Sequence, residues 1–293
     1  MKNKTKRTKS AIRIEELAKL NSATRYLEIG VFKGETFLDL QFPLMVGVDP
    51  DFQFDIEANK REGKYFIPET SDSFFKKLAE GHEAVKGIAG HFGDDGIKFD
   101  LIFIDGWHSY DQSLRDFENS LLFAHDKTIW ILDDSIPQNP YASVDDYGKS
   151  LQYSNKVGVY NKAGNGHVYQ TVLTIHDKYP DFSYCTLLAD KYQTVVWKAP
   201  GGKRTPVCNS PEEIKSIDYF DMLNYAPQFM IESDDSYLEL VGKINTPAKY
   251  DVPDAWERLL FSKVETMRER ELLETVRKNP LLRLVARLHG IRT

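Results

Sequence analysis

Three aspartates and one histidine have the types and the spacing to do acid–base or metal chemistry. Asp105 ends one apolar run, His108 follows it by three residues, and the pair Asp133 and Asp134 ends the next apolar run. Carboxylates that are held together repel one another unless a positive charge lies between them. The sequence therefore predicts either a divalent cation or a positively charged ligand between these acids, with His108 on a loop above the same place.

The elements that must position these residues form a strand–helix–strand unit. Residues 99–104 are short, apolar and rich in Phe and Ile, which is typical of a parallel strand buried on both faces. Residues 110–123 carry apolar side chains at helical spacing, and residues 128–132 are a second apolar run. A right-handed crossover makes the two strands parallel, so we expect the acids that follow them to meet at one edge of the sheet.

A glycine-bearing turn follows an earlier predicted strand. Residues 26–29 form the strand, with Glu28 near its end, and Gly30 and Gly34 bound the turn before a short helix. Such a turn brings backbone amides close to a ligand, although glycines also allow close packing in any strand–helix unit.

Acidic and hydroxyl residues follow the next two predicted strands. Asp49 ends the strand 44–48, roughly twenty residues beyond the glycine turn, where a doubly wound nucleotide-binding fold places an acid against the ribose. The alternative is that Asp49 caps a turn before Pro50. Ser71 and Asp72 begin a later helix at the same edge, either as helix caps or as contacts to a base.

The last two predicted strands, 182–188 and 194–198, are separated by too few residues for a parallel crossover. We therefore expect an antiparallel pair, which an all-parallel nicotinamide-binding domain lacks. The Pro-, Asn- and Tyr-rich segment 135–166 shows no strong period and is expected to cover the edge of the sheet that bears the acids.

Composition limits the classes of function. The chain has 293 residues, a net charge of −6 and a pI near 5.7, which gives no electrostatic basis for binding nucleic acid. Cys185 and Cys208 are the only cysteines, so neither a disulfide framework nor a zinc cluster is expected, and a reducing, cytoplasmic location is favoured. We expect neither a secretory signal nor a transmembrane segment.

Three parts are expected along the chain. Residues 1–20 are a basic tail and an N-terminal helix capped by Ser10, residues 21–200 are the α/β domain, and residues 201–293 are a helical extension. The helices expected in this extension, a charged helix at 255–278 and a short helix at 281–288, could mediate homo-oligomer formation.

With these residues in view, the chain resembles class I S-adenosylmethionine-dependent methyltransferases. It is most similar to a bacterial group with Leu-Glu-Ile-Gly and Ile-Asp-Gly-x-His motifs, here YLEIGVFKGETF and IDGWHSYDQSLRDFENSL, together with VGVDP, TSDSFF and ILDD. The resemblance covers about residues 26–198. It implies a doubly wound, seven-stranded, mainly parallel sheet with an antiparallel terminal hairpin.

The resemblance also implies roles for individual residues. The motifs are similar to those of metal-dependent sugar O-methyltransferases, in which acids hold magnesium and a histidine is the base. Carried over, His108 is the base, Asp105 has a catalytic role, and the Mg²⁺ ligands are Asp105, Asp133 and Asp134. The implied contacts to S-adenosylmethionine are Glu28, Gly30, Gly34, Asp49, Ser71, Asp72 and Asp105.

The leading hypothesis is an enzyme that moves the methyl group of S-adenosylmethionine to a hydroxyl of a sugar, a glycan or another small natural product. A non-catalytic cofactor-binding or scaffold protein of the same fold is the second hypothesis, although all the expected site residues are present. A nicotinamide-dependent oxidoreductase is the third. The absence of a third glycine in the turn and the expected terminal hairpin weigh against it.

Overall fold

The computed structural model describes most of the chain up to residue 242. The described residues are 7–93, 96–158, 164–187, 192–199, 202, 204–233 and 236–242. The predicted helices at 255–278 and 281–288, and the possible oligomer contact through them, lie outside the described residues.

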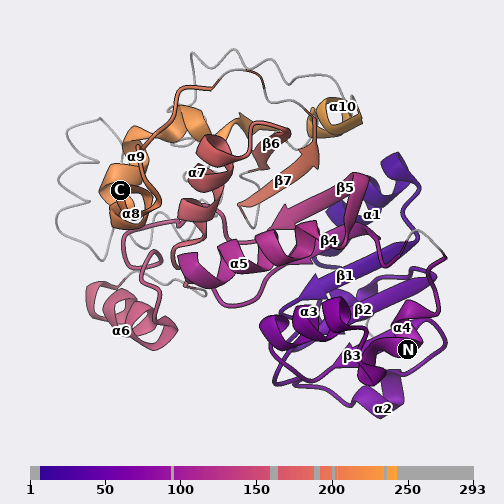
Figure 1. Cartoon of the computed structure of the whole chain (residues 1–293). Helices are drawn as coiled ribbons and strands as arrows, with labels where there is room; N and C mark the ends of the chain where they lie inside the picture. Colours follow the sequence, from indigo (N-terminus) through magenta and orange to yellow (C-terminus); the bar gives the residue numbers. More distant parts are fainter. Residues whose placement is uncertain are drawn as a thin grey trace.

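A mixed sheet forms the centre of the described part (Figure 1). The strand order is β3-β2-β1-β4-β5-β7-β6-β8. Strands β1 to β5 are parallel, β7 is antiparallel to both β5 and β6, and β8 is parallel to β6. The strands are β1 (Arg25–Ile29), β2 (Leu44–Val48), β3 (Lys64–Ile67), β4 (Phe99–Ile104), β5 (Ala124–Leu132), β6 (Phe182–Leu187), β7 (Gln193–Lys198) and β8 (Ile231–Glu232).

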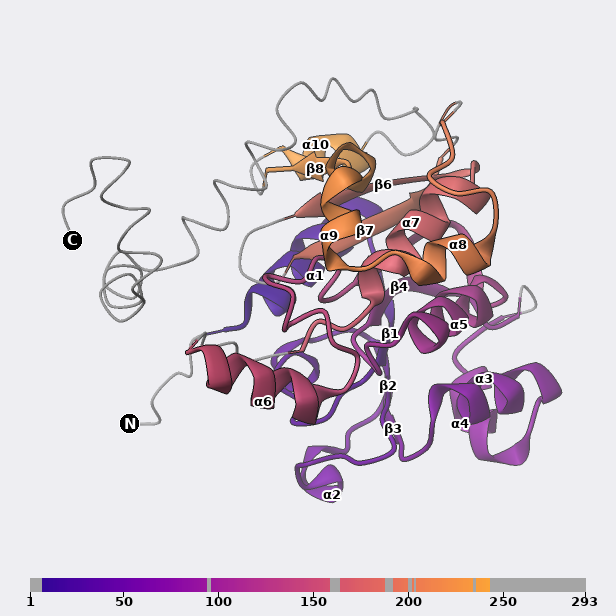
Figure 2. The same ribbon diagram turned by 90° about the vertical axis from the view of Figure 1, so that its left-hand side faces the viewer.

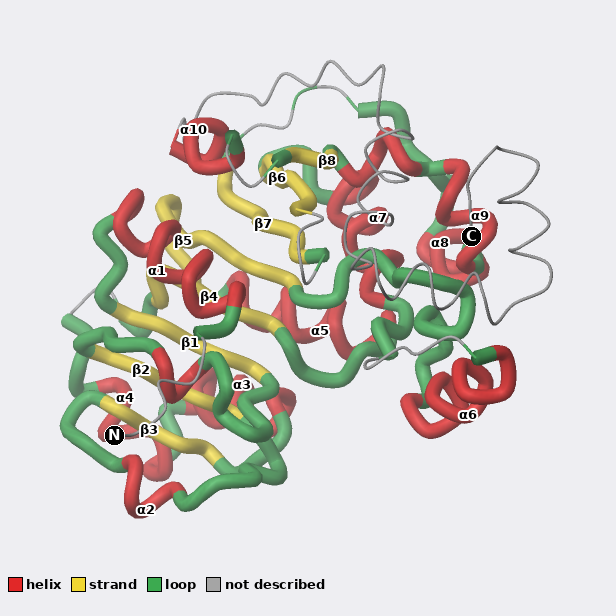
Figure 3. Tube along the Cα trace, turned by 180° about the vertical axis from the view of Figure 1, so that it is seen from behind, coloured by secondary structure: helices red, strands yellow, loops and turns green. Residues whose placement is uncertain are grey.

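Helices cover both faces of the sheet. Figure 1 shows α3, α5 and α7 on one face, and Figure 3, seen from behind, shows α1 across the other. The α-helices are α1 (Lys9–Asn21), α2 (Ile56–Asn59), α3 (Ser71–Glu80), α4 (Lys86–Ala89), α5 (Tyr110–Leu121), α6 (Tyr147–Val157), α7 (Val168–Lys178), α8 (Pro211–Ser216), α9 (Tyr219–Asn224) and α10 (Tyr237–Gly242). Short 3-10 helices are η1 (Phe37–Asp39), η2 (Glu83–Val85) and η3 (Ala226–Phe229).

Strand alternation separates the buried side chains into two cores. Ile102 and Ile104 of β4 face α5 and α7, whereas Leu101 and Phe103 of the same strand face α1. Because both faces are covered, the central strands are apolar at successive positions, which is why β4 was recognisable in the sequence.

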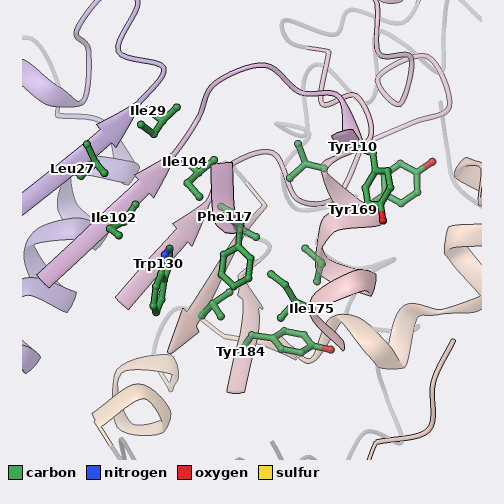
Figure 4. Packing of buried hydrophobic residues seen from close by; sticks show 14 of the residues in the cluster. Leu27, Ile29, Ile102, Ile104, Tyr110, Phe117, Trp130, Tyr169, Ile175 and Tyr184 are labelled. Atoms are coloured by element: carbon green, nitrogen blue, oxygen red, sulfur yellow. The ribbon is translucent and has the colours of Figure 1, made fainter. Parts of the chain in front are cut away.

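The core on the α5 face contains a group of aromatic rings (Figure 4). Phe117 of α5 lies at its centre, with ring centroids 5.8 Å from Trp130, 5.4 Å from Tyr179 and 5.9 Å from Phe182. The Trp130 indole N–H is satisfied because it donates to Ser120 Oγ at 2.8 Å. This group ties α5 to the β5 and β6 strands, so the helix that follows the Asp105 loop is rigidly placed.

The predicted fold class is confirmed, and several details differ. The antiparallel pair β6–β7 is present, and the short strand β8 adds an eighth member beside the expected seven. The segment 135–166 contains a helix, α6, that its weak periodicity did not predict. Figures 1 and 2 show α6 at the periphery of the molecule.

The predicted cap of the first helix is wrong. Thr8 is the N-cap, because its Oγ1 accepts the backbone N–H of Ala11 at 3.0 Å, and the helix begins at Lys9. Ser10 instead lies inside the first turn and is buried. Both residue types can cap a helix, and the packing of α1 on the sheet decides between them.

The segment after residue 206 packs onto the same sheet. The Tyr169 hydroxyl of α7 donates to the Ile217 carbonyl at 2.7 Å, and the Tyr237 hydroxyl of α10 donates to Glu16 of α1 at 2.8 Å. Among the described helices, none is both long and apolar enough to cross a membrane.

Phe117→Ala is expected to lower the free energy of unfolding by about 3–5 kcal/mol, because Phe117 is fully buried and its ring contacts would leave a cavity. Urea unfolding followed by tryptophan fluorescence measures the change. Leu122→Ala, at a side chain that is 66% exposed, is the control and should change stability by less than about 0.5 kcal/mol. Equal effects of the two substitutions would contradict this account of the core.

Candidate active site

The candidate site lies at the carboxyl ends of β1, β4 and β5. The strand order reverses between β1 and β4, and such a switch point is where open α/β sheets bind ligands. Glu28 comes from β1, Asp105 follows β4, and Asp133 and Asp134 follow β5. The structure thus brings the predicted acids to one edge of the sheet.

The glycine turn after β1 is pressed against the loop after β4. Gly30 has φ +87°, and a Cβ atom there would collide with the carbonyl oxygen of Asp105. Its N–H donates to the Val48 carbonyl at 2.9 Å. Only glycine allows this approach, so Gly30 sets the distance between the two ligand-facing loops.

Asp49 joins the glycine turn to the end of β2. One carboxylate oxygen accepts the N–H of Phe32 at 2.7 Å, and the other accepts the N–H of Asp51 at 2.7 Å. The turn-capping role that was the alternative for Asp49 is therefore present. A contact with a ribose stays a prediction, and the two backbone bonds would hold the carboxylate in place for it.

Glu28 is buried under the glycine turn. The Tyr26 hydroxyl donates to its Oε2 at 2.5 Å. Burial raises the pKa of Glu28 well above its ordinary value, and although the Tyr26 bond opposes this rise, the charges of Asp105 and Asp133 add to it. Glu28, Asp105 and Asp133 are therefore mutually repelling groups.

A polar network joins α3 to α5 beside this edge. Thr70, and not Ser71 or Asp72, caps α3 by accepting the Ser73 N–H at 3.3 Å. Gln112 Nε2 donates to Ser71 Oγ at 3.1 Å and to Asp116 Oδ1 at 2.9 Å. Burial raises the pKa of Asp116 to about 6, even though bonds from Ser71 and Gln112 favour its charged form.

Asp105, His108 and Asp134 form a compact group of possible metal ligands. One ligand atom from each lies within 4.8 Å of the others. His108 Nε2 is 3.5 Å from Asp105 Oδ1, and His108 Nδ1 is 3.6 Å from Asp134 Oδ2. Asp134 has φ +53°, a left-handed conformation that is strained for a non-glycine residue and is common at functional sites.

The ring of His108 is fixed by a backbone carbonyl. Its Nδ1 lies 2.7 Å from the Gly164 oxygen. A carbonyl only accepts hydrogen bonds, so Nδ1 carries the proton, and Nε2 is the atom that gains or loses one. Burial alone would lower the pKa of His108, but the bond to Asp105 and the charges of Asp134 and Asp105 outweigh it and raise the pKa.

The same group of charges acts on Asp105. Burial and the charge of Asp133 raise the pKa of Asp105, and the bond to His108 opposes the rise. The two carboxylates of this group suit a divalent cation, which would relieve the repulsion between the acids.

Asp133 and Asp134 have different hydrogen-bond partners. Gln193 Nε2 donates to Asp133 Oδ1 at 3.0 Å, and the residue is buried. The group of converging ligand atoms found among the described residues consists of Asp105, His108 and Asp134. Direct coordination by Asp133 thus stays a prediction.

Two amide side chains at the site were missed from the sequence. Asn165 Nδ2 donates to Asp134 Oδ1 at 2.7 Å, and Gln193 makes the bond to Asp133 given above. Asn165 stands between Gly164 and Gly166, and this glycine pair was a signal for a backbone placed close to other atoms. Gln193 carried no local signal, because it looks like an ordinary strand residue.

Residues 27–135, from β1 to the residue after Asp134, match a family model described as a methyltransferase domain. The match indicates a methyltransferase domain in this part of the chain. The antiparallel β6–β7 pair is consistent with it, since the sheet is not the all-parallel one of a nicotinamide-binding domain. A comparison of the chain with curated proteins found no match.

The chain is also similar to solved structures, each at 15% identity. One is the O-methyltransferase from Bacillus cereus in complex with SAH, with 68% of this chain and 84% of that chain covered and a TM-score of 0.44. Another is the O-methyltransferase TomG from Streptomyces achromogenes, involved in tomaymycin synthesis (68% and 83%, TM-score 0.37). A third is MycE from the mycinamycin biosynthetic pathway, in complex with Mg and SAH (67% and 51%, TM-score 0.39).

Asp116→Asn is expected to stabilise the protein at neutral pH. The raised pKa of Asp116 means that its ionisation costs folding free energy, on the order of 2–3 kcal/mol above pH 7. The cost disappears below about pH 4, where the unfolded chain is also protonated, so the gain should shrink as the pH falls from 7 to 4. Thermal unfolding across this range measures it.

The control for this series is Asp181→Asn, at an exposed carboxylate, which should change stability little at any pH. A stabilisation by Asp116→Asn that is the same at pH 4 and pH 7 would refute the electrostatic explanation.

Proposed function

We propose that the protein is an S-adenosylmethionine-dependent methyltransferase that transfers the methyl group to a hydroxyl oxygen of a sugar, a glycan or another small natural product. The observation that carries this proposal is the placement of His108 between the two acids, with its Nε2 toward Asp105 and its Nδ1 toward Asp134. Methyl transfer to oxygen needs an aligned acceptor and a group that takes the hydroxyl proton, and His108 suits the second need.

The donor would lie across the switch point between β1 and β4. The residues proposed to hold it are Glu28, Gly30, Gly34, Asp49, Ser71, Asp72 and Asp105. When bound, S-adenosylmethionine supplies a methyl group on a positively charged sulfur. The buried carboxylates of Glu28 and Asp49 offer acceptors to an ammonium group and to ribose hydroxyls.

Asp105 and Asp134, with Asp133 as a further candidate, would hold a divalent cation, and the proposed ion is Mg²⁺. The converging oxygens and the strained backbone of Asp134 support this part of the proposal. When bound, such a cation polarises the acceptor hydroxyl and opposes the effect of the acids on the His108 pKa.

His108 is the proposed general base, and the surrounding chain prepares it. The Gly164 carbonyl holds the Nδ1 proton, which leaves Nε2 to accept the proton of the acceptor. Asp105 lies 3.5 Å from Nε2 and stabilises the protonated ring that results.

Asp49→Ala is expected to weaken binding of S-adenosylhomocysteine about 10- to 100-fold, because a charged acceptor for ribose hydroxyls is lost. Calorimetry with S-adenosylhomocysteine and with its 2′-deoxy analogue separates a direct contact of Asp49 with the ribose from its role in anchoring the glycine turn. Wild-type protein should discriminate between the two ligands, and the variant should not. Asp55→Ala, which removes the N-cap of α2, is the matched control and should bind normally.

His108→Ala is expected to lower turnover by about 100-fold or more, the usual contribution of a positioned base, with nearly unchanged donor affinity. Formation of S-adenosylhomocysteine in the presence of Mg²⁺ is measured with mixtures of hydroxyl, amine and thiol acceptors. Methyl transfer to amines or thiols alone would contradict the proposed reaction.

The matched control is His125→Ala. His125 also pairs with an aspartate, Asp100, at 2.8 Å, but at the amino ends of β4 and β5. Its loss should leave turnover of the folded enzyme close to wild type. If the two histidine variants lose turnover equally, His108 has a structural and not a chemical role.

A further inference from the structure

Each of the paired acids accepts a hydrogen bond from an amide side chain. Asn165 Nδ2 donates to Asp134 Oδ1 at 2.7 Å, and Gln193 Nε2 donates to Asp133 Oδ1 at 3.0 Å. We propose that Asn165 and Gln193 are positioning residues that hold the two acids in the orientation that binds the divalent cation. This inference rests on the proposed function, because it assumes a cation at the acids.

An amide is well suited to this task because it is a neutral donor. It satisfies one oxygen of a buried carboxylate and favours the charged form, yet it leaves the negative charge available to a cation. A lysine or arginine at the same place would cancel that charge and compete with the metal. Removal of a partner that orients a metal ligand in this way typically lowers metal affinity about 10- to 100-fold.

The orientation of the Gln193 amide is fixed by a guanidinium. The buried Arg13 of α1 donates to Gln193 Oε1, so the opposite end of the amide must be the donor. That nitrogen reaches both Asp133 Oδ1 and Ser10 Oγ, the latter at 2.8 Å. Two residues of the N-terminal helix α1 therefore fix the amide of Gln193, and this amide donates to Asp133.

Asn165 is held by a short strap, residues 164–167, that lies against the His108 loop. Gly166 has φ +58°, and a Cβ atom there would collide with the His108 carbonyl oxygen. The His167 N–H donates to that oxygen at 2.7 Å, and the Gly164 carbonyl bonds His108 Nδ1. These contacts fix the strap on both sides of Asn165.

The amide oxygen of Asn165 helps to explain why an amide occupies this position. Its Oδ1 is buried and has no hydrogen-bond partner among the described residues. A buried amide oxygen without a partner costs stability, whereas a leucine of similar shape would not incur that cost. The amide at this position is therefore explained by the bond that it donates to Asp134.

The test is the affinity of the full-length protein for Mn²⁺, measured by electron paramagnetic resonance without donor or acceptor. Asn165→Leu and Gln193→Met keep the approximate side-chain shape and remove the donor. Each should weaken Mn²⁺ binding by about 10- to 100-fold. Affinity for S-adenosylhomocysteine, measured on the same samples, should stay nearly unchanged and shows that the variants are folded.

Gln170→Met is the matched control. Gln170 is also a buried amide, but its Nε2 donates to the backbone carbonyls of Lys215 and Ile217, at 3.0 and 2.9 Å. Its loss should leave Mn²⁺ affinity unchanged even if it lowers thermal stability. Asp134→Asn is the reference for loss of the metal site itself.

The outcomes separate this inference from the proposed function. Wild-type Mn²⁺ affinity in both Asn165→Leu and Gln193→Met, with binding lost in Asp134→Asn, overturns the positioning role and leaves the metal site standing. An equal loss of Mn²⁺ affinity in Gln170→Met also overturns the positioning role, because the loss would then reflect a general loss of stability. Wild-type protein that binds no Mn²⁺ overturns the metal site and the inference together.

Discussion

The repulsion among carboxylates at one edge of the sheet is the constraint on which the site depends. The charges of Asp105 and Asp133 raise the pKa of Glu28, the charge of Asp133 raises the pKa of Asp105, and Asp134 adds a fourth acid beside His108. A fold that gathers these groups must either protonate them, pair them or bind a cation between them. The described contacts use the neutral amides of Asn165 and Gln193 and the ring of His108 for much of this task.

The backbone produces this crowding as a direct result of its topology. Parallel strands joined by right-handed crossovers end at the same edge, so acids placed after β1, β4 and β5 must converge. Gly30 brings the first loop into contact with the Asp105 loop, and the left-handed backbone of Asp134 separates that residue from its neighbour Asp133. Two adjacent acids thereby gain different partners: His108 and Asn165 for one, Gln193 for the other.

These partners come from parts of the chain that would otherwise look unrelated to catalysis. The strap at 164–167 fixes the ring of His108 and reaches Asp134, and α1 acts on Asp133 through Gln193. The aromatic group around Phe117 holds α5 against the sheet, so the loop before this helix has a defined position. The geometry of the site is therefore a property of the whole described domain and not of the motif loops alone.

The sequence by itself determined the sheet, the crossovers and the edge at which Asp105, His108, Asp133 and Asp134 gather. It could do so because the period of apolar residues records which side of an element is buried, and parallel topology then places the strand ends. Only the tertiary structure decided the pairing of each acid, the cap of α1 and the presence of α6. Asn165 lies 31 residues from Asp134, and Gln193 lies 60 residues from Asp133. No local pattern encodes such a contact, because it depends on how distant segments pack once the chain has folded.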